Sequence, residues 1–399
     1  MAKNGRRFEE AFVVSAVRTP VGKFGGAYRS TTAIQLGTAV VRHAISEAGI
    51  SAEDVEEVIL GNVLPAGLGQ SPARQCAIHS GVPLSSGSFS VNKVCGSGLK
   101  AIMLAANSVR AGENGIIVAG GIENMSMSPY ISKSARWGSR YGNSEFQDSM
   151  IVDGLWDAYN NFHMMITGEI VAERFNVSRE EADAFAYSSQ KKALKATEEG
   201  YFREETVPME ITKDGKQMEI VRDEGIRPDT TLEKLATLKP KFKENGICTA
   251  GNSSQLSDGA SAVVIMSESR VEEMGIKPIA RIVDYITGGT RPEWVMEAPI
   301  ETTRKLLKRN EMDINSIDLV EHNEAYASAS VAVRKALGID KGKFNITGGA
   351  VALGHPLGAS GARITTTLLH NMKRLKRDSG LSTLCLGGGN AVSMLFERC

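Results

Sequence analysis

The sequence repeats one order of helix and strand patterns near its two ends, and this repeat restricts the fold more than any other feature. In the first copy, a helix end at 43–49 precedes a turn and a buried strand at 54–62. In the second copy, the same polar and apolar order recurs at 306–309 and 315–323. Asn62 and Asn323 fall at matching points, so we expect two similar structural units.

A second pair of segments supports the repeat. A helix with apolar residues three and four apart follows Cys95, and a short Val- and Ile-rich strand follows it at 116–121. Likewise, a helix opens at Ala359 and a strand at 382–386 runs into glycines. Alternating amphipathic helices and buried strands indicate an α/β fold.

The repeat divides the chain. We expect an N-terminal half at 1–121 and a C-terminal half at 270–399, each of class α/β. The residues at 122–248 are polar or strongly charged, and we interpret them as an inserted loop domain. Residues 249–269 would return the chain to the first half.

Composition excludes several functions. The chain has 399 residues, with 46 basic and 46 acidic side chains, so no bulk charge attracts nucleic acid or an anionic membrane. No apolar run of membrane-spanning length occurs, and the charged N-terminus does not fit a secretory signal. Five scattered Cys predict free thiols in a reducing cytoplasm, and no Cys/His cluster predicts a metal site.

Cys95 lies at a predicted strand-to-helix junction, before Gly96 and Gly98. The positive end of the following helix favours a thiolate, and the adjacent N–H groups point outward to hold an oxyanion. Taken alone, this position favours a small buried apolar residue, which is the usual fate of a free thiol.

His355 lies in a glycine-rich loop between Gly349 and Gly361. So many glycines imply that substrate or another backbone comes close, and a fixed His suits general-base work on a thiol. A hydrogen-bonded structural loop His explains the pattern equally well.

Cys385 and Asn323 each follow or end an apolar strand pattern. Cys385 precedes Gly387, whose exposed backbone amide suits an oxyanion site, although a buried strand Cys is the plainer interpretation. Asn323 is placed to position a water or polarise a carbonyl, and a helix N-cap is its alternative. Neighbouring His322 should point to the opposite side of the strand and be structural.

The repeat brings these residues together. In a pseudo-twofold α/β fold, ligands bind outside the carboxyl ends of the strands. Cys95, Asn323, His355 and Cys385 all belong to such ends, so we expect them to converge on one site.

These motifs, in this order, resemble the thiolase family along essentially the whole chain. The matching stretches are 15–26, 92–98, 323–325, 354–358 and 385–389. The resemblance implies a five-layered α-β-α-β-α fold of two similar halves with an inserted loop domain that binds coenzyme A.

The resemblance also implies a ping-pong acyltransferase. His355 would help deprotonate Cys95, which attacks a 3-oxoacyl-CoA, and Cys385 would protonate the departing enolate. Asn323 with its water, and His355, would stabilise the thioester enolate. The N–H groups of Cys95 and Gly387 would hold the tetrahedral oxyanion.

Coenzyme A is then a substrate, and no cofactor is implied. The resemblance assigns substrate contacts to six further residues, which are Leu155, His163, Met164, Arg227, Ala250 and Ser254. It also implies a homodimer or homotetramer, without nucleic acid or membrane partners, and leaves room for an accessory subunit.

The chain departs from the family pattern where the acyl group would lie. Met165 replaces a usual Gly, Val295 and Met296 replace a usual Met-Gly pair, and Asn390 and Ala391 replace Gln-Gly. Acetoacetyl-CoA is the default substrate. The alternative is a bulkier or unusual 3-oxoacyl-CoA, aromatic or dicarboxylic, from anaerobic degradation.

Two further alternatives are weaker. A ketoacyl-synthase-type condensing enzyme would lack the second Cys, so Cys385 argues against it. A non-catalytic thiolase-like subunit would not need Cys95, Asn323, His355 and Cys385 together.

Overall fold

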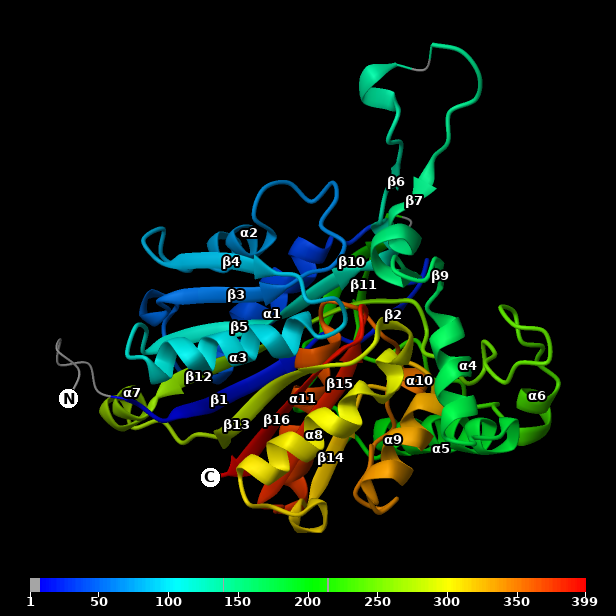
Figure 1. Ribbon diagram of the computed structural model, residues 1–399. Coiled ribbons are helices and arrows are strands. Elements are labelled where there is room, and N and C mark those ends of the chain that lie inside the picture. The colour runs from blue at the N-terminus through cyan, green and yellow to red at the C-terminus, as the bar shows by residue number, and fades with distance from the viewer. Residues whose placement is uncertain (1–7, 139, 214) are drawn as a thin grey trace.

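One mixed sheet runs through the computed structural model, which describes residues 8–138, 140–213 and 215–399 (Figure 1). Its first part contains β4 (Gly87–Val91), β3 (Glu57–Gly61) and β5 (Ile116–Asn124) in parallel. β12 (Ser257–Ser267) pairs antiparallel with β5, and β1 (Ala11–Arg18) pairs antiparallel with β12. The short β2 (Gly22–Lys23) extends β12.

The second part of the sheet repeats this arrangement. β14 (Leu319–His322) is parallel to β15 (Ser379–Leu386), and β16 (Asn390–Arg398) and β13 (Ala280–Gly289) follow in antiparallel pairs. A short register between β13 and β1 joins the two parts. The predicted α/β fold of two similar halves is therefore confirmed.

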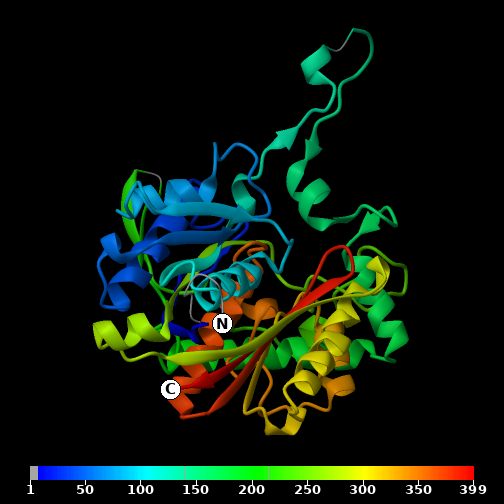
Figure 2. The ribbon, with the colours of Figure 1, turned by 60° about the vertical axis from the view of Figure 1, so that its left-hand side comes forward.

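Helices make three layers around the two parts of the sheet (Figures 1 and 2). α1 (Ala33–Glu47) and α2 (Pro72–His79) pack on the outer face of the first part. α3 (Ser97–Arg110) and α11 (Ser360–Leu375) lie between the two parts and share one apolar core. α8 (Ala298–Arg309) and α9 (Ala327–Leu337) pack on the second part. The order of layers is α-β-α-β-α.

The two central helices meet at their N-terminal ends because glycines allow it. A Cβ on Gly361 would lie 2.4 Å from the Leu99 nitrogen, and one on Gly98 would lie 2.8 Å from the Ala362 nitrogen. This contact brings the residues that precede both helices, including Cys95 and the His355 loop, to the same end of the sheet.

The remaining helices and strands lie in the segment that follows β5 or in other connections between strands of the main sheet. Their bounds are β6 (Tyr130–Ile131), β7 (Gln147–Asp148), β8 (Trp156–Asp157), β9 (Phe162–His163), α4 (Met165–Arg174), α5 (Arg179–Glu198), β10 (Met209–Lys213), β11 (Lys216–Ile220), α6 (Leu232–Ala236), α7 (Glu268–Met274) and α10 (Ala350–Leu353). β6 and β7 lie on an arm that projects from the layers (Figure 2). α5 begins at a capping box of Ser178 and Glu181 and packs against α9 and α10. In the described part of the chain, no helix combines the length and apolarity needed to cross a membrane.

Candidate active site

A tight turn places Cys95 at the start of α3. Val94 has φ 47°, a left-handed conformation that is strained for a β-branched residue. Ser97 holds the turn, because its hydroxyl donates to the Val94 carbonyl at 2.6 Å and accepts from the Lys93 N–H at 2.8 Å. The Asn92 side chain also accepts from the Val94 N–H at 3.0 Å. Strain held in this way is typical of functional sites.

The Cys95 thiol is surrounded by backbone donors. The N–H groups of Gly387 and of Cys95 itself both interact with its sulfur and lower its pKa. Burial has the larger effect and raises the pKa to about 12, with nearby Glu123 adding to the rise. The backbone N–H groups thus favour a thiolate, as expected, but desolvation outweighs them. A base is required to activate this thiol.

Cys385 lies near the end of β15, two residues before Gly387 in the sequence. It is 2% exposed, and its thiol donates to the Met296 sulfur at 3.5 Å. Burial raises the pKa of Cys385, and the neighbouring Cys95 raises it further. The two thiols therefore lie within electrostatic range of each other, as the predicted convergence requires.

His355 follows α10 and is held from several sides. Its N–H donates to the Gln255 carbonyl at 3.0 Å, and its side chain is 6% exposed. The imidazole Nδ1 lies 2.5 Å from the Ser360 hydroxyl oxygen. We assign the Ser360 proton to the Pro356 carbonyl at 2.8 Å, and Nδ1 then carries the hydrogen. Nε2 is then left unprotonated and able to accept a proton.

The His355 imidazole is neutral over the physiological range. Burial lowers its pKa to about 3, and the positive charge of Arg363 lowers it further. A neutral imidazole with a free Nε2 has the form that a general base needs.

Asn323 directly follows β14 and is fully buried. Its side-chain nitrogen lies 3.4 Å from Nε2 of His355, and its side-chain oxygen has no partner among the described residues. It does not cap a helix, since α9 begins later, after Tyr326. His322 points to the other face, where Nδ1 lies 3.1 Å from the Ser330 hydroxyl and the ring stacks on Phe344.

Sequence reasoning missed Glu123, which is fully buried at the end of β5. One carboxylate oxygen accepts from the N–H groups of Gly358 at 2.8 Å and Val63 at 3.1 Å. The other accepts from the Asn62 side chain at 2.8 Å and the Leu64 N–H at 3.2 Å. Glu123 thus ties the His355 loop to the end of β3. The sequence did carry a signal for Glu123, which is a charged residue at the end of an apolar strand pattern.

Arg363 was also missed. It lies on α11, is 1% exposed, and none of its guanidinium nitrogens has a hydrogen-bond partner among the described residues. Glu321, on the inner face of β14 and 2% exposed, is the carboxylate that interacts with it most strongly. Burial raises the pKa of Glu321 to about 8. The sequence pattern did not indicate this residue, because helix periodicity places Arg363 on the polar face of α11 with Thr367, His370 and Arg374, a face usually exposed to solvent.

A cavity of about 540 Å³ opens onto His355. Of the six predicted substrate contacts, Leu155, His163, Arg227, Ala250 and Ser254 line it. Met164 does not line the cavity, and its neighbour Met165 does. Met164 is the residue before α4, and both methionines pack against the apolar cluster that includes Tyr326.

The cavity wall combines apolar and basic side chains. His163 stacks on Phe242 with ring centroids 4.1 Å apart. Lys23, Arg227 and Lys241 also line it, so cationic groups are present for an anionic ligand. Cys95 packs against Leu357 in the cluster beneath.

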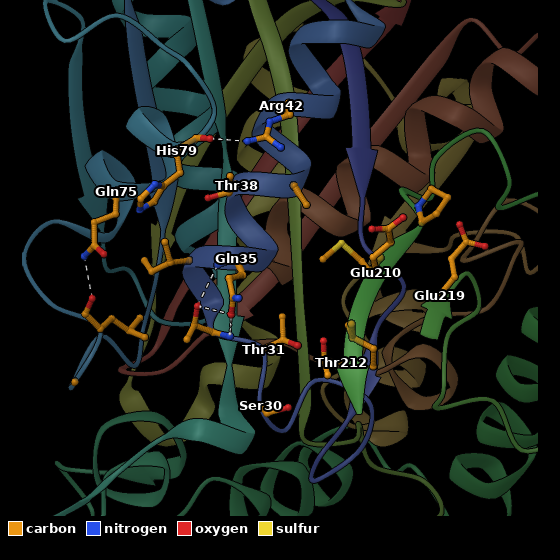
Figure 3. Close-up of a pocket in the computed structure, with 18 residues that line it drawn as sticks. Ser30, Thr31, Gln35, Thr38, Arg42, Gln75, His79, Glu210, Thr212 and Glu219 are labelled. Atoms are coloured by element: carbon orange, nitrogen blue, oxygen red, sulfur yellow. Dashed lines mark hydrogen bonds between the residues drawn. The ribbon is translucent and has the colours of Figure 1, made fainter. Parts of the chain in front are cut away.

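A larger cavity of about 930 Å³ lies between α1 and β10, and it contains none of the predicted site residues (Figure 3). Several of its polar groups already bond one another or the nearby backbone. Arg42 donates to the His79 carbonyl at 2.6 Å, and Gln75 donates to the Leu68 carbonyl at 2.8 Å. This cavity therefore offers no comparable chemistry.

All five cysteines are free thiols, as predicted. Within residues 8–138, 140–213 and 215–399, no group of three or more His, Cys, Asp or Glu side chains is arranged to hold a metal ion.

Comparison with known proteins places this geometry in context. The family model "Thiolase, N-terminal domain" matches residues 11–269, and "Thiolase, C-terminal domain" matches residues 276–398. The chain is 47% identical over 391 residues to an acetyl-CoA acetyltransferase of Pseudomonas aeruginosa, covering 98% of this chain and 100% of the relative.

Two further proteins are similar to this chain over nearly its full length. A probable acetyl-CoA acyltransferase of Staphylococcus epidermidis is 46% identical, covering 97% of this chain and 98% of the relative. A crystal structure of the Bacillus anthracis acetyl-CoA acetyltransferase superposes with a TM-score of 0.97 at 39% identity, covering 99% of this chain and 100% of that chain.

Proposed function

Because this chain belongs to the thiolase family, we propose that it catalyses reversible thiolytic cleavage of a 3-oxoacyl-CoA by coenzyme A through an acyl-Cys95 intermediate. The chain is an acyltransferase enzyme, as the family models and the acetyltransferase relatives indicate. The observation that carries the proposed mechanism is the placement of the Cys95 thiol beside the Gly387 N–H, Cys385 and the His355 loop.

In the first half-reaction, His355 Nε2 accepts the Cys95 proton as the sulfur attacks the 3-oxo carbon. Support for this comes from the neutral imidazole, whose Nδ1–H is fixed on Ser360. The N–H groups of Cys95 and Gly387 hold the tetrahedral oxyanion, because preorganised donors stabilise charge where it develops. The bond between C2 and C3 then breaks.

Cys385 protonates the departing thioester enolate. Its buried thiol keeps its proton until then, because its pKa is raised. Asn323, through its side-chain amide and a bound water, and His355 stabilise that enolate. Coenzyme A finally attacks the acyl-Cys95 thioester, takes the acyl group and regenerates the thiol.

Residues 122–248 are proposed to act as the coenzyme A-binding segment, with residues 249–269 returning to the first half. The cavity lined by Leu155, His163, Arg227 and Ser254 supports this assignment. Met164 is replaced by Met165 in that set. Coenzyme A serves as substrate, and the reaction as proposed uses no other cofactor.

Acetoacetyl-CoA is the default substrate we propose, consistent with relatives named acetyl-CoA acetyltransferases. The alternative is a bulkier or unusual 3-oxoacyl-CoA, and Met165, Val295 and Met296 favour it because they form the wall near Cys385.

We propose a homodimer or homotetramer in the cytoplasm. Two surfaces support self-association. β4 is an edge strand with exposed residues, and an exposed edge is a ready surface for strand pairing. The arm also exposes four aromatic residues, which are Tyr130, Trp137, Tyr141 and Phe146. Light scattering of the purified chain measures its oligomeric state, and thiolysis by the purified chain alone shows whether an accessory subunit is needed for activity.

The decisive experiment is acetoacetyl-CoA thiolysis, followed by loss of the Mg²⁺-enolate absorbance, with mass spectrometry of the quenched enzyme. We expect acetyl-CoA formation and a mass increase of one acetyl group on Cys95. Full activity in Cys95→Ser would rule out the mechanism.

A further inference from the structure

The substrate cavity is lined by two hydroxyl-bearing side chains, Ser253 and Tyr326, and the Ser253 hydroxyl is buried without a protein partner among the described residues. The Ser253 side chain is 4% exposed, lines the cavity, and its oxygen makes no hydrogen bond within the described part of the chain. Tyr326 is 7% exposed and lines the same cavity, and no described residue bonds its hydroxyl. Buried polar groups are nearly always paired, so the unpaired Ser253 hydroxyl in the cavity wall points to a ligand.

The two residues are neighbours across a short pairing of segments. Ser253 and Tyr326 form an antiparallel bridge, and the Ser254 N–H donates to the Ala325 carbonyl at 2.9 Å. Both side chains are therefore carried by paired backbone rather than by free loops. Their position is set before a ligand arrives.

The Tyr326 ring packs against Gly168, which has no side chain. A Cβ on Gly168 would lie 3.0 Å from the ring, so only glycine leaves room for it. The phenol lies within electrostatic range of Cys95 and Cys385, which together with burial raise its pKa well above 10. The hydroxyl thus remains a protonated donor beside the reacting sulfurs.

Apolar side chains surround the Cys385 thiol. Met296 contacts the Cys385 thiol at 3.5 Å, and Val295 and Met165 belong to the same cluster. Tyr326 belongs to the same cluster, so an acyl chain on Cys95 would meet its hydroxyl among thioethers and aliphatic groups, with Ser253 bridged beside it.

We propose that Ser253 and Tyr326 select a 3-oxoacyl-CoA whose acyl chain carries a hydrogen-bond-accepting oxygen. This inference rests on the proposed thiolase function and names the substrate class of the same site. An unsubstituted chain would leave both hydroxyls buried and unpaired, which costs free energy, whereas an oxygen on the chain satisfies them. A hydroxyl, a ketone or a carboxylate supplies the same acceptor.

The test measures kcat/KM of the purified full chain for three substrates with six-carbon acyl groups. They are 3-oxohexanoyl-CoA, 6-hydroxy-3-oxohexanoyl-CoA and 3-oxoadipyl-CoA. We expect kcat/KM for at least one oxygenated chain to exceed that of the unsubstituted chain about tenfold or more. Which oxygenated chain is favoured identifies a hydroxyl or a carboxylate as the acceptor.

The variants Ser253→Ala and Tyr326→Phe should each lower the ratio of oxygenated to unsubstituted kcat/KM by about five- to tenfold. Ser254→Ala is the matched control, because this neighbouring hydroxyl is assigned to the coenzyme A arm and should lower kcat/KM for all three substrates alike. Thermal unfolding of each variant confirms that it is folded.

Equal kcat/KM for the three substrates in the unaltered enzyme would overturn the inference. So would equal losses for all three substrates in Ser253→Ala and Tyr326→Phe, because the hydroxyls would then bind the coenzyme A arm. Acetoacetyl-CoA cleavage by the unaltered enzyme is measured separately. Its absence overturns the proposed function, whereas its presence without an oxygen preference overturns the inference alone.

Discussion

Ser360 determines which nitrogen of His355 is the base. The Nδ1 atom of His355 lies 2.5 Å from the Ser360 oxygen, and Ser360 gives its own proton to the Pro356 carbonyl at 2.8 Å. The hydroxyl can then only accept from the imidazole. Nε2 is consequently the nitrogen available to Cys95.

Removing this hydroxyl should allow the wrong tautomer. We expect Ser360→Ala to lower kcat for acetoacetyl-CoA thiolysis by about tenfold or more, with a small change in KM. Ser360→Thr keeps the hydroxyl and is the rescue variant. If Ser360→Ala and Ser360→Thr have equal kcat, the tautomer is fixed by another contact.

Cys385 should separate the two half-reactions. Without its thiol, no acid protonates the enolate, whereas Cys95 and His355 can still exchange an acetyl group with coenzyme A. We expect Cys385→Ala to lose about a hundredfold or more of C–C cleavage while isotope exchange between acetyl-CoA and labelled coenzyme A persists. Cys76→Ala removes a buried thiol from α2, in the apolar core of the first half, and is the control for simple loss of packing. Parallel loss of both activities in Cys385→Ala would contradict the assigned role.

Arg363 should set the acidic limb of the pH profile. Its positive charge disfavours the imidazolium and contributes to lowering the pKa of His355 to about 3. Removing the charge must therefore raise that pKa toward its ordinary value of about 6.5. We expect Arg363→Gln to move the acidic limb of kcat/KM to higher pH, and Arg363→Lys to leave it near its original position. An identical limb in the unaltered enzyme and Arg363→Gln would show that burial alone controls His355.

Glu123 should contribute to stability through its four hydrogen bonds. In Glu123→Gln, an NH₂ group would face two N–H donors, so we expect a loss of about 1–3 kcal/mol in the free energy of unfolding. Urea titration of the unaltered enzyme and of Glu123→Gln measures this loss. Asn62→Asp is a second variant that perturbs the same contact.

The loss should also depend on pH. Burial raises the pKa of Glu123 to about 7, so between about pH 4.5 and 7 the native carboxyl keeps a proton that the unfolded chain has lost. Its contribution to stability is therefore full below that range and falls as pH rises through it. The difference between the unaltered enzyme and Glu123→Gln should narrow from pH 5 to pH 8. A constant difference would show that Glu123 is ionised throughout.

The sequence alone determined the fold and the main chemical groups, because both are written in local patterns. The repeated helix and strand periods predicted two α/β halves, since burial on one face requires that spacing. The strand ends placed Cys95, Asn323, His355 and Cys385 at one edge, and glycine-rich motifs near them matched one family. These features depend on neighbours in the chain.

Only the tertiary structure decided how each group behaves. The pKa of Cys95 rises rather than falls because desolvation by distant segments outweighs the adjacent helix terminus. Ser360 selects the His355 tautomer, and Met165 rather than Met164 lines the cavity. Glu123 and Arg363 act from surroundings assembled by segments far apart in sequence. Protonation and cavity shape are sums over such contacts, and no local pattern encodes them.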